Sequence, residues 1–253
     1  GDLAGFAAST YMRGISFVQI PTSLTAQVDS SIGGKTGVNT ALAKNMVGTF
    51  AQPDGVFIDP EVLSTLGQRE LIEGMGEVIK YGMIRDEKLF TLLEQHTLET
   101  VSEVMDEIVP TCIDIKRDVV EHDEFDTGER MILNFGHTLG HAVEALAGFG
   151  TFSHGAAVAE GMRFAARLGV DVVGTSAELV DAQDELLDAL GLPALAWSAP
   201  AEEMLAAMKR DKKTRAGEVR FVLPRDIGDW ELVAVPDEVI LEHLRRWEAS
   251  KSL

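Results

Sequence analysis

The segment from Asn134 to His141 reads Asn-Phe-Gly-His-Thr-Leu-Gly-His and carries two histidines four residues apart. On an α-helix this spacing projects both side chains from one face, so His137 and His141 can address one small site. Residues that suit a core poorly are Asn134, Gly136 and Thr138. Residues that can supply an apolar face on the other side are Phe135, Leu139 and Ala142. The pattern predicts a helix whose polar face looks into a cleft; the alternative is two unrelated histidines on a half-exposed helix.

A third histidine follows at His154. Together with His137 and one carboxylate it would form the two-nitrogen, one-oxygen ligand set typical of catalytic zinc, which leaves a coordination position open. Glu77 is the best candidate carboxylate, because it lies among glycines and apolar residues in the segment 73–82. The alternative for Glu77 and Lys80 is a solvated i,i+3 ion pair worth roughly 0.2–0.5 kcal/mol.

The charge of the chain limits its partners. The 253 residues carry a formal net charge of −19, which argues against nucleic acid and anionic membranes, since both require a basic face. The single cysteine, Cys112, excludes an internal disulfide and fits a reducing compartment, so we expect a cytoplasmic protein. The sequence shows no apolar run approaching about 20 residues and no signal peptide.

Within this acidic chain, several cations occupy glycine-rich or turn positions. They are Arg13, Lys35, Lys80, Lys116, Arg130 and Lys212. Such a set suits a small ligand with phosphate and carboxylate groups. The segment 27–39 combines glycines and hydroxyls with Lys35, as in a loop that surrounds an anion, although an ordinary turn is the alternative. It is not a P-loop, because the upstream glycine of that motif is missing.

Hydrophobic periodicity predicts an α/β part followed by a mostly α part, with the division near residue 60. Helices are expected over 2–12, 63–66, 68–84, 89–96, 97–108, 110–121, from 128–130 through His137 to 146, 153–168, 177–190 and 239–247. Strands are expected over 15–20, described as short and buried, over 55–59, and over 220–223 and 230–234, which form a C-terminal β-hairpin. The acidic segment 121–126 is interpreted as solvated surface. The chain begins without methionine and runs straight into a helical pattern, so we expect a piece of a longer protein.

Several motifs together resemble the 3-dehydroquinate synthase family. They lie at 1–14, 28–39, 76–82, 134–141, 153–161, 211–213 and 220–224. The resemblance covers essentially the whole chain in order. It implies an NAD-dependent, zinc- or cobalt-dependent lyase of the shikimate pathway, which converts the sugar-acid phosphate DAHP into 3-dehydroquinate and phosphate. It also implies that 1–60 is the end of an NAD-binding α/β domain and 61–253 a helical metal- and substrate-binding domain. A cytoplasmic homodimer is expected.

The resemblance also assigns residues. It implies that Glu77, His137 and His154 hold the metal, whereas His141 faces the substrate and handles protons, assisted by Lys116 and Asn134. The NAD site would comprise Gly1, Asp2, Thr22, Ser23, Lys35, Lys44, Asn45 and the segment from Val62 to Thr65. Substrate contacts would come from Arg13, Asp29, Lys35, Lys80, Lys116, Arg130, Asn134 and Lys212.

One departure from the family concerns the start of the chain, because family members have roughly a hundred residues before the position of Gly1. We therefore expect the 253 residues alone to bind zinc, to bind NAD weakly or not at all, and to release no phosphate from DAHP. Three alternatives stay open: another NAD-dependent sugar-phosphate cyclase, a metal-dependent polyol dehydrogenase, and a non-catalytic metal-binding fragment.

Overall fold

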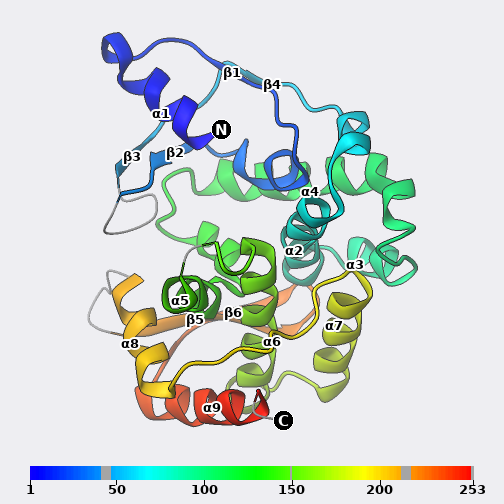
Figure 1. Ribbon diagram of the computed structural model, residues 1–253, viewed down its shortest axis with the longest axis vertical. Coiled ribbons are helices and arrows are strands. Elements are labelled where there is room, and N and C mark those ends of the chain that lie inside the picture. The colour runs from blue at the N-terminus through cyan, green and yellow to red at the C-terminus, as the bar shows by residue number, and fades with distance from the viewer. Residues whose placement is uncertain (41–46, 149, 212–217, 252–253) are drawn as a thin grey trace. The chain divides into compact units, whose positions relative to one another are not determined.

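A computed structural model describes residues 1–40, 47–148, 150–211 and 218–251 (Figure 1). The chain divides into two compact units, the first of residues 1–75 with 103–130 and the second of residues 76–102 with 131–253. The architecture confirms the expected α/β part followed by a mostly α part. The division proposed at residue 60, between an NAD-binding part and a helical part, stays a prediction.

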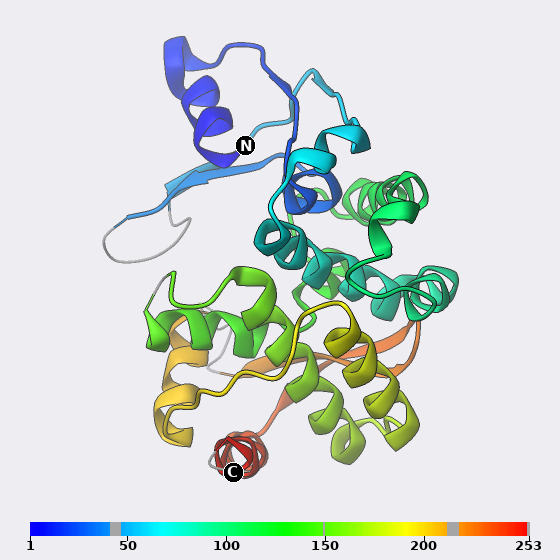
Figure 2. The same cartoon turned by 45° about the vertical axis from the view of Figure 1, so that its right-hand side comes forward.

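The first unit begins with α1 (Asp2–Thr10), which is followed by the short 3₁₀ helix η1 (Tyr11–Arg13). Two strands expected from the sequence, β1 (Val18–Gln19) and β4 (Gly55–Val56), form a parallel pair. A second pair, β2 (Lys35–Val38) with β3 (Val47–Phe50), is antiparallel and was not anticipated. Helix α1 packs along β2, as Figure 2 shows.

Two sequence predictions about these strands are wrong. Ile15, Val18 and Ile20 are exposed rather than buried, because the parallel pair is only two residues long and too small to cover them. Lys35 lies in a strand rather than in an anion-binding loop. The turn before it is made by Gly33 and Gly34, whose φ angles of 98° and 66° suit glycine.

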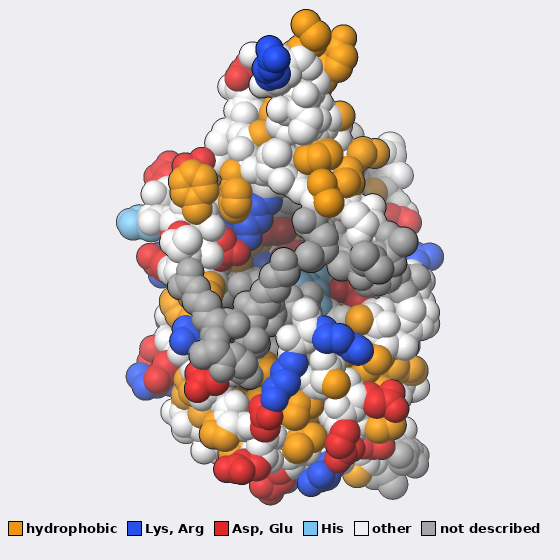
Figure 3. All heavy atoms as spheres, turned by 90° about the vertical axis from the view of Figure 1, so that its left-hand side faces the viewer, with side chains coloured by type: hydrophobic (Ala, Val, Ile, Leu, Met, Phe, Trp, Pro, Cys, Tyr) orange, Lys and Arg blue, Asp and Glu red, His pale blue; other side chains and the backbone are white. Residues whose placement is uncertain are grey.

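Exposed large apolar side chains are concentrated in this unit. Those described are Leu3, Tyr11, Met12, Ile15, Val18, Ile20, Val47, Phe50, Phe57 and Phe125; in the described part of the second unit Val170 is the one such residue. Orange side chains gather accordingly on the upper part of the face drawn in Figure 3, where α1 lies. Exposure of this extent is typical of surfaces that pack against other polypeptide.

The rest of the first unit is helical. It contains the π-helical turn η2 (Ala26–Ser30), the 3₁₀ helix η3 (Pro60–Thr65), the start of α2 (Gln68–Arg85) and α4 (Met105–His122), which packs against η2 and η3. The predicted boundary between the helices expected over 97–108 and 110–121 is wrong. The first is reduced to η4 (Val101–Val104), and α4 continues through Pro110. The proline is tolerated because it and Asp106, whose carbonyl loses its partner, both lie on the exposed side.

The second unit contains most of the predicted helices and the predicted hairpin. Its elements are the end of α2, α3 (Glu87–Glu94), α5 (His137–Ala147), α6 (His154–Val172), α7 (Ala177–Ala189), α8 (Ala201–Asp211), β5 (Val219–Asp226), β6 (Asp229–Val235) and α9 (Asp237–Ser250). Helix α8 was missed, although Ala201, Met204, Leu205 and Met208 have helical spacing. Helix α6 is central, since it contacts α5, α7, α9 and β5.

The helix that carries His137 starts later than expected. The preceding residues form the 3₁₀ helix η5 (Glu129–Asn134), and Gly136, at φ 77°, separates it from α5. Asn134 is therefore not on the helix. Thr138 is also not on a polar face, because it is buried and its hydroxyl donates to the carbonyl of Arg220 at 3.2 Å.

Two segments approach helix α6 very closely. One is the residue just before α5, and the other lies within α2. A Cβ atom on Gly161 of α6 would lie 1.7 Å from the carbonyl oxygen of Gly136. A Cβ atom on Gly76 of α2 would lie 2.9 Å from the Cα atom of Gly155. Both approaches therefore require glycine. None of the helices in the described ranges is long and apolar enough to cross a membrane.

We predict that Gly161→Ala lowers the midpoint of thermal unfolding, because the added methyl group cannot coexist with the Gly136 carbonyl. Overpacking of this kind costs about 1–3 kcal/mol or more. The control is Gly128→Ala, whose added Cβ would meet nothing closer than 3.8 Å. Circular dichroism during heating measures both variants, and equal midpoints for the two would contradict the close approach.

Candidate metal and substrate site

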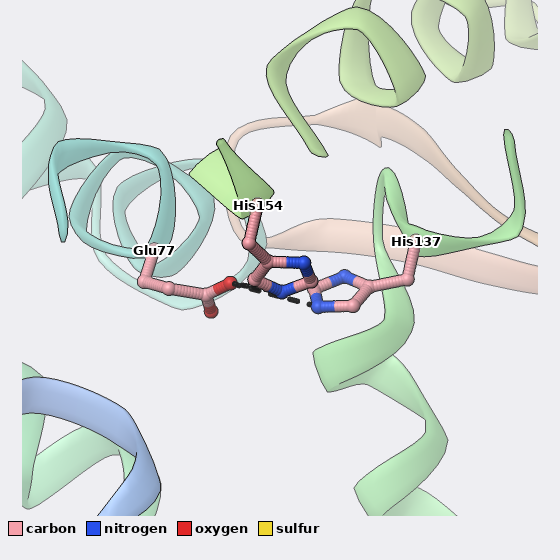
Figure 4. A group of neighbouring side chains, drawn as sticks. All are labelled: Glu77, His137 and His154. Atoms are coloured by element: carbon pink, nitrogen blue, oxygen red, sulfur yellow. Dashed lines mark ion pairs between the residues drawn. The ribbon is translucent and has the colours of Figure 1, made fainter. Parts of the chain in front are cut away.

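Three side chains of the second unit converge on one point. Figure 4 shows Glu77 reaching from α2, and His137 and His154 reaching from the first residues of α5 and α6. The Oε1 atom of Glu77 lies 3.5 Å from Nε2 of His137 and 3.6 Å from Nε2 of His154. Each ligand residue adjoins one of the close-packed glycines, at Gly76, Gly136 and Gly155. The backbone contacts with α6 therefore bring together the residues that the sequence predicted as ligands.

The hydrogen bonds of the two imidazoles show which ring nitrogen directs a lone pair toward Glu77. Nδ1 of His137 lies 3.0 Å from the carbonyl oxygen of Phe135, and Nδ1 of His154 lies 3.3 Å from Oε2 of Glu144. Carbonyl and carboxylate oxygens only accept, so in the neutral rings both Nδ1 atoms carry the proton. Both Nε2 atoms then point lone pairs toward Glu77 Oε1.

The Oε1 atom of Glu77 is buried and has no hydrogen-bond partner. A buried carboxylate oxygen without a partner is costly, and lone pairs on neighbouring nitrogens add repulsion. A cation among the three atoms removes both problems. Two donors at about 2.1 Å from a tetrahedral ion lie about 3.4 Å apart, which agrees with the distances found here. The three residues therefore fit a zinc-like ion.

The charge environment favours neutral histidine ligands. Burial lowers the pKa of His137 well below its ordinary value of 6.5, and the nearby charges of Lys80, His154 and His141 lower it further. Metal ions bind the neutral imidazole, so this shift suits a ligand. Lys80 is itself only 1% exposed, and its ammonium donates to Oε2 of Glu77. The interpretation of this pair as solvated is wrong, since both groups are buried.

His141 lies beside the donor set. Its ring centroid is 5.3 Å from that of His137 and 6.0 Å from that of His154. Nitrogen or oxygen atoms of His141, Glu144 and His154 also lie close enough to form a second possible ligand group. Asn134 is half-buried at the end of η5. The geometry therefore groups Glu77, His137 and His154 with His141 close by.

The first unit brings together two other predicted substrate residues. The Lys116 ammonium lies 2.6 Å from the carbonyl oxygen of Asp29 and 2.5 Å from its carboxylate. Lys116 is buried on α4, whereas Asp29 lies on η2, so the packing of these two elements places the pair. A buried lysine beside a half-buried aspartate is a group that can bind a polar ligand or move a proton.

Arg130 is buried and is held by main-chain acceptors. Its Nη2 atom donates to the carbonyl of Gly33 at 3.0 Å and Nη1 to the carbonyl of Glu124 at 2.5 Å, while Nε has no hydrogen-bond partner. Gly33 admits this contact, because a Cβ atom there would lie 2.4 Å from Arg130 Nη2. Arg130 thus orders the turn before Lys35, whatever its role toward a substrate.

The acidic segment 121–126 is more structured than the sequence suggested. Asp123 accepts backbone hydrogen bonds from Thr127, Gly128 and Arg130, and such bonds hold its pKa at about 2, below the ordinary 3.8. This stabilisation is present above pH 3.8 and is lost as the pH falls toward 2. Asp126 pairs with Lys35, has a φ of 58° and has a buried Oδ1 without a partner. Four of its six residues are exposed, as expected for solvated surface, whereas Asp123 and Asp126 are partly buried and held by these bonds.

The remaining predicted residues take part in none of the contacts described above or lie outside the described ranges. In the first unit, Arg13 and Thr22 are exposed, and Thr65 donates to the carbonyl of Val62 within η3. Gly1 and Thr65 are exposed, whereas Asp2, Ser23 and Val62 are partly buried. Lys44, Asn45 and Lys212 lie outside the described residues.

Sequence reasoning missed two acidic residues of these clusters. Glu144 follows His141 by three residues and His137 by seven, so helical spacing placed it on their face of α5. Asp126 gave no comparable signal, because its pairing with Lys35 joins residues far apart in the chain.

A pocket of about 540 Å³ lies elsewhere in the second unit, along α6 and α9. Several of its charged groups form ion pairs with one another: Arg163 and Arg167 pair with Asp184, and Lys251 pairs with Glu160. The chemistry of the donor set, rather than the size of this pocket, marks the candidate site.

Comparison with known proteins identifies the family of this chain. The model of the 3-dehydroquinate synthase N-terminal part matches residues 1–73, and that of the C-terminal part matches residues 74–214. A 3-dehydroquinate synthase of Streptococcus suis (strain 05ZYH33) is 52% identical over 251 residues, which cover 97% of this chain and 70% of the relative.

Two solved structures are also similar. One is ValA, a 2-epi-5-epi-valiolone synthase from Streptomyces hygroscopicus with NAD⁺ and Zn²⁺ bound, at a TM-score of 0.88 and 30% identity over 98% of this chain and 70% of that one. The other is a 2-deoxy-scyllo-inosose synthase complexed with carbaglucose-6-phosphate, NAD⁺ and Co²⁺. Its TM-score is 0.87, and it is 28% identical over 97% of this chain and 71% of that one. Because family models match along 1–214 and the relative is 52% identical, the chain belongs to the 3-dehydroquinate synthase family.

Proposed function

We propose that this protein converts DAHP (3-deoxy-D-arabino-heptulosonate 7-phosphate) into 3-dehydroquinate and inorganic phosphate, a step of the shikimate pathway. The observation that carries the proposal is the donor set of buried Glu77 with half-buried His137 and His154, found in a chain of this family. The substrate is a small anion, and the pairs around Lys80 and Lys116 supply cations at buried positions in an otherwise acidic protein.

The proposed cofactors are NAD and one zinc or cobalt ion, as in the similar structures. Glu77, His137 and His154 would hold the ion through Oε1 and the two Nε2 atoms. When bound, the metal would act as a Lewis acid on a substrate hydroxyl and NAD would accept and return a hydride within one turnover. The proposed contacts of NAD are Gly1, Asp2, Thr22, Ser23, Lys35, Lys44, Asn45, Val62 and Thr65.

The chain's own residues would bind the substrate and move protons. His141 lies beside both metal-binding imidazoles and has ring nitrogens that can donate or accept a proton, so we assign it proton transfer, assisted by Asn134 and Lys116. Other substrate contacts would come from Arg13, Asp29, Lys35, Lys80, Arg130 and Lys212. Lys80 would also hold the carboxylate of Glu77 through its bond to Oε2.

The proposal includes a cytoplasmic homodimer. The exposed apolar residues of the first unit support association with further polypeptide, and Cys112, the single cysteine of the chain, suits a reducing compartment. Another sugar-phosphate cyclase is the competing activity. The 52% identity to a 3-dehydroquinate synthase, against 30% and 28% to the two other cyclases, favours DAHP as the substrate.

The activity is tested by measuring phosphate release from DAHP with zinc and with NAD present at less than one equivalent of substrate. We further propose that residues before Gly1 complete the NAD site. The 253-residue chain is therefore compared with a version extended before Gly1 by the matching part of the Streptococcus suis relative. The extended protein should release phosphate without net NADH formation. The 253 residues alone should release no phosphate. An extended protein that binds zinc and NAD but leaves DAHP intact would contradict the proposed function.

The metal ligands are tested by zinc affinity. Glu77→Gln and His154→Ala should each weaken zinc binding by at least about 100-fold, because each removes a donor atom from the ion. His141→Ala is the matched control, since that ring lies nearby but is not assigned to the metal. Competition with a coloured chelator measures all three. An equal loss in His141→Ala and His154→Ala would show that the ligand assignment is wrong.

Lys80 is tested separately from the metal. Lys80→Met removes a buried charge next to Glu77 and should lower kcat by about 10²–10³-fold, the range for loss of one preorganised donor. Lys88→Met, an exposed residue on α3, is the control. Both variants are assayed in the extended, zinc-loaded protein. Wild-type kcat in Lys80→Met would remove Lys80 from the proposed machinery.

A further inference from the structure

Glu144 is a buried carboxylate to which no role has yet been given. It is 8% exposed and lies on α5, on the helix face that carries His137 and His141. Its Oε2 atom lies 3.3 Å from Nδ1 of His154. A buried carboxylate is costly unless it is paired and hydrogen-bonded, so its position next to an imidazole N–H calls for an explanation.

The contact determines how His154 faces the donor set. A carboxylate accepts the Nδ1 proton, which leaves Nε2 as a lone pair directed at Glu77 Oε1, 3.6 Å away. It also restrains the plane of the ring, since Nδ1 is anchored on the Glu144 carboxylate. His137 obtains the same tautomer from the main-chain carbonyl of Phe135. The two ligands thus differ in one respect: only the anchor of His154 carries a charge.

We propose that Glu144 is a positioning residue, which holds His154 in the metal-binding tautomer and makes its imidazole a stronger donor. This inference rests on the proposed metal site. A carboxylate that accepts from a metal-bound histidine raises the basicity of the ring, and loss of such a partner costs about 10–100-fold in metal affinity. The charges agree in sign: Glu77 and Glu144 carry two negative charges against one positive charge on Lys80, and the excess of one negative charge favours a cation.

A competing possibility is that Glu144 binds the metal itself. Its carboxylate, His141 and His154 form the second possible ligand group of the described residues. That arrangement would use Nδ1 of His154 and would leave Glu77 Oε1 without a partner. The arrangement with Glu77 satisfies the orphaned oxygen, so we assign Glu144 to the support of His154.

The test uses two variants of Glu144 in the 253-residue chain. Glu144→Gln can still accept from Nδ1 but has no charge, whereas Glu144→Ala removes both properties. Zinc affinity should fall by about 10-fold in the first and about 100-fold in the second. Glu160→Gln is the matched control, because it also neutralises a buried carboxylate of the second unit, one bonded to Leu195 N and Trp247 Nε1. Its zinc affinity should stay within about twofold of wild type.

Visible absorption of the cobalt-loaded protein supplies a second readout. Glu144→Gln should keep the band positions and intensity of wild type, because the donor atoms around the ion are unchanged. A changed spectrum would show that Glu144 is a ligand, and wild-type zinc affinity in both variants would show that it does not support His154. If Glu77→Gln also kept wild-type affinity, the metal site itself would be wrong, which separates the two failures. Should Glu144→Ala not fold, the nearly isosteric Glu144→Gln decides.

Discussion

The candidate site of the second unit depends on a buried carboxylate oxygen that accepts no hydrogen bond. Oε1 of Glu77 faces the lone pairs of two imidazoles at 3.5 and 3.6 Å, and it has no hydrogen-bond partner. Without a cation these atoms repel one another, so the fold must hold them in place by other means. It does so through close backbone contacts of α6 with Gly76 and Gly136, which fix the residues on either side of them. Packing thus pre-forms a site that an ion can then stabilise.

Around these atoms, the second unit sets protonation by burial and by hydrogen-bond acceptors. Burial and the charge of Lys80 keep the pKa of His137 low, so its ring is neutral and can bind a metal. The carbonyl of Phe135 and the carboxylate of Glu144 select the Nδ1–H tautomers. Lys80 occupies the other oxygen of Glu77, which leaves Oε1 for the ion. Each ligand is therefore supported by a second group, as is usual for metal sites.

The sequence predicted the fold class and the grouping of Glu77, His137 and His154, while the role of these three residues as metal ligands stays a prediction. His137, His154 and Glu77 were predictable because histidines and a glycine-flanked carboxylate have few other uses in such positions. Lys35 was misjudged because its strand depends on pairing with Phe50, a contact between distant segments. Thr138 was misjudged because its hydroxyl finds an acceptor on β5, which periodicity within α5 cannot reveal. Glu144 could have been found from helical spacing, but the need for it follows only from its contact with His154 in the folded structure.

The most direct test of this account is a crystal structure of the zinc-loaded protein, with diffraction data collected on both sides of the zinc absorption edge. The account predicts one anomalous peak with bonds of about 2.0–2.2 Å to Glu77 Oε1 and to Nε2 of His137 and His154. In the same map, Glu144 should accept from Nδ1 of His154 without touching the ion. An ion bound to His141 or Glu144 in place of Glu77 would contradict the account.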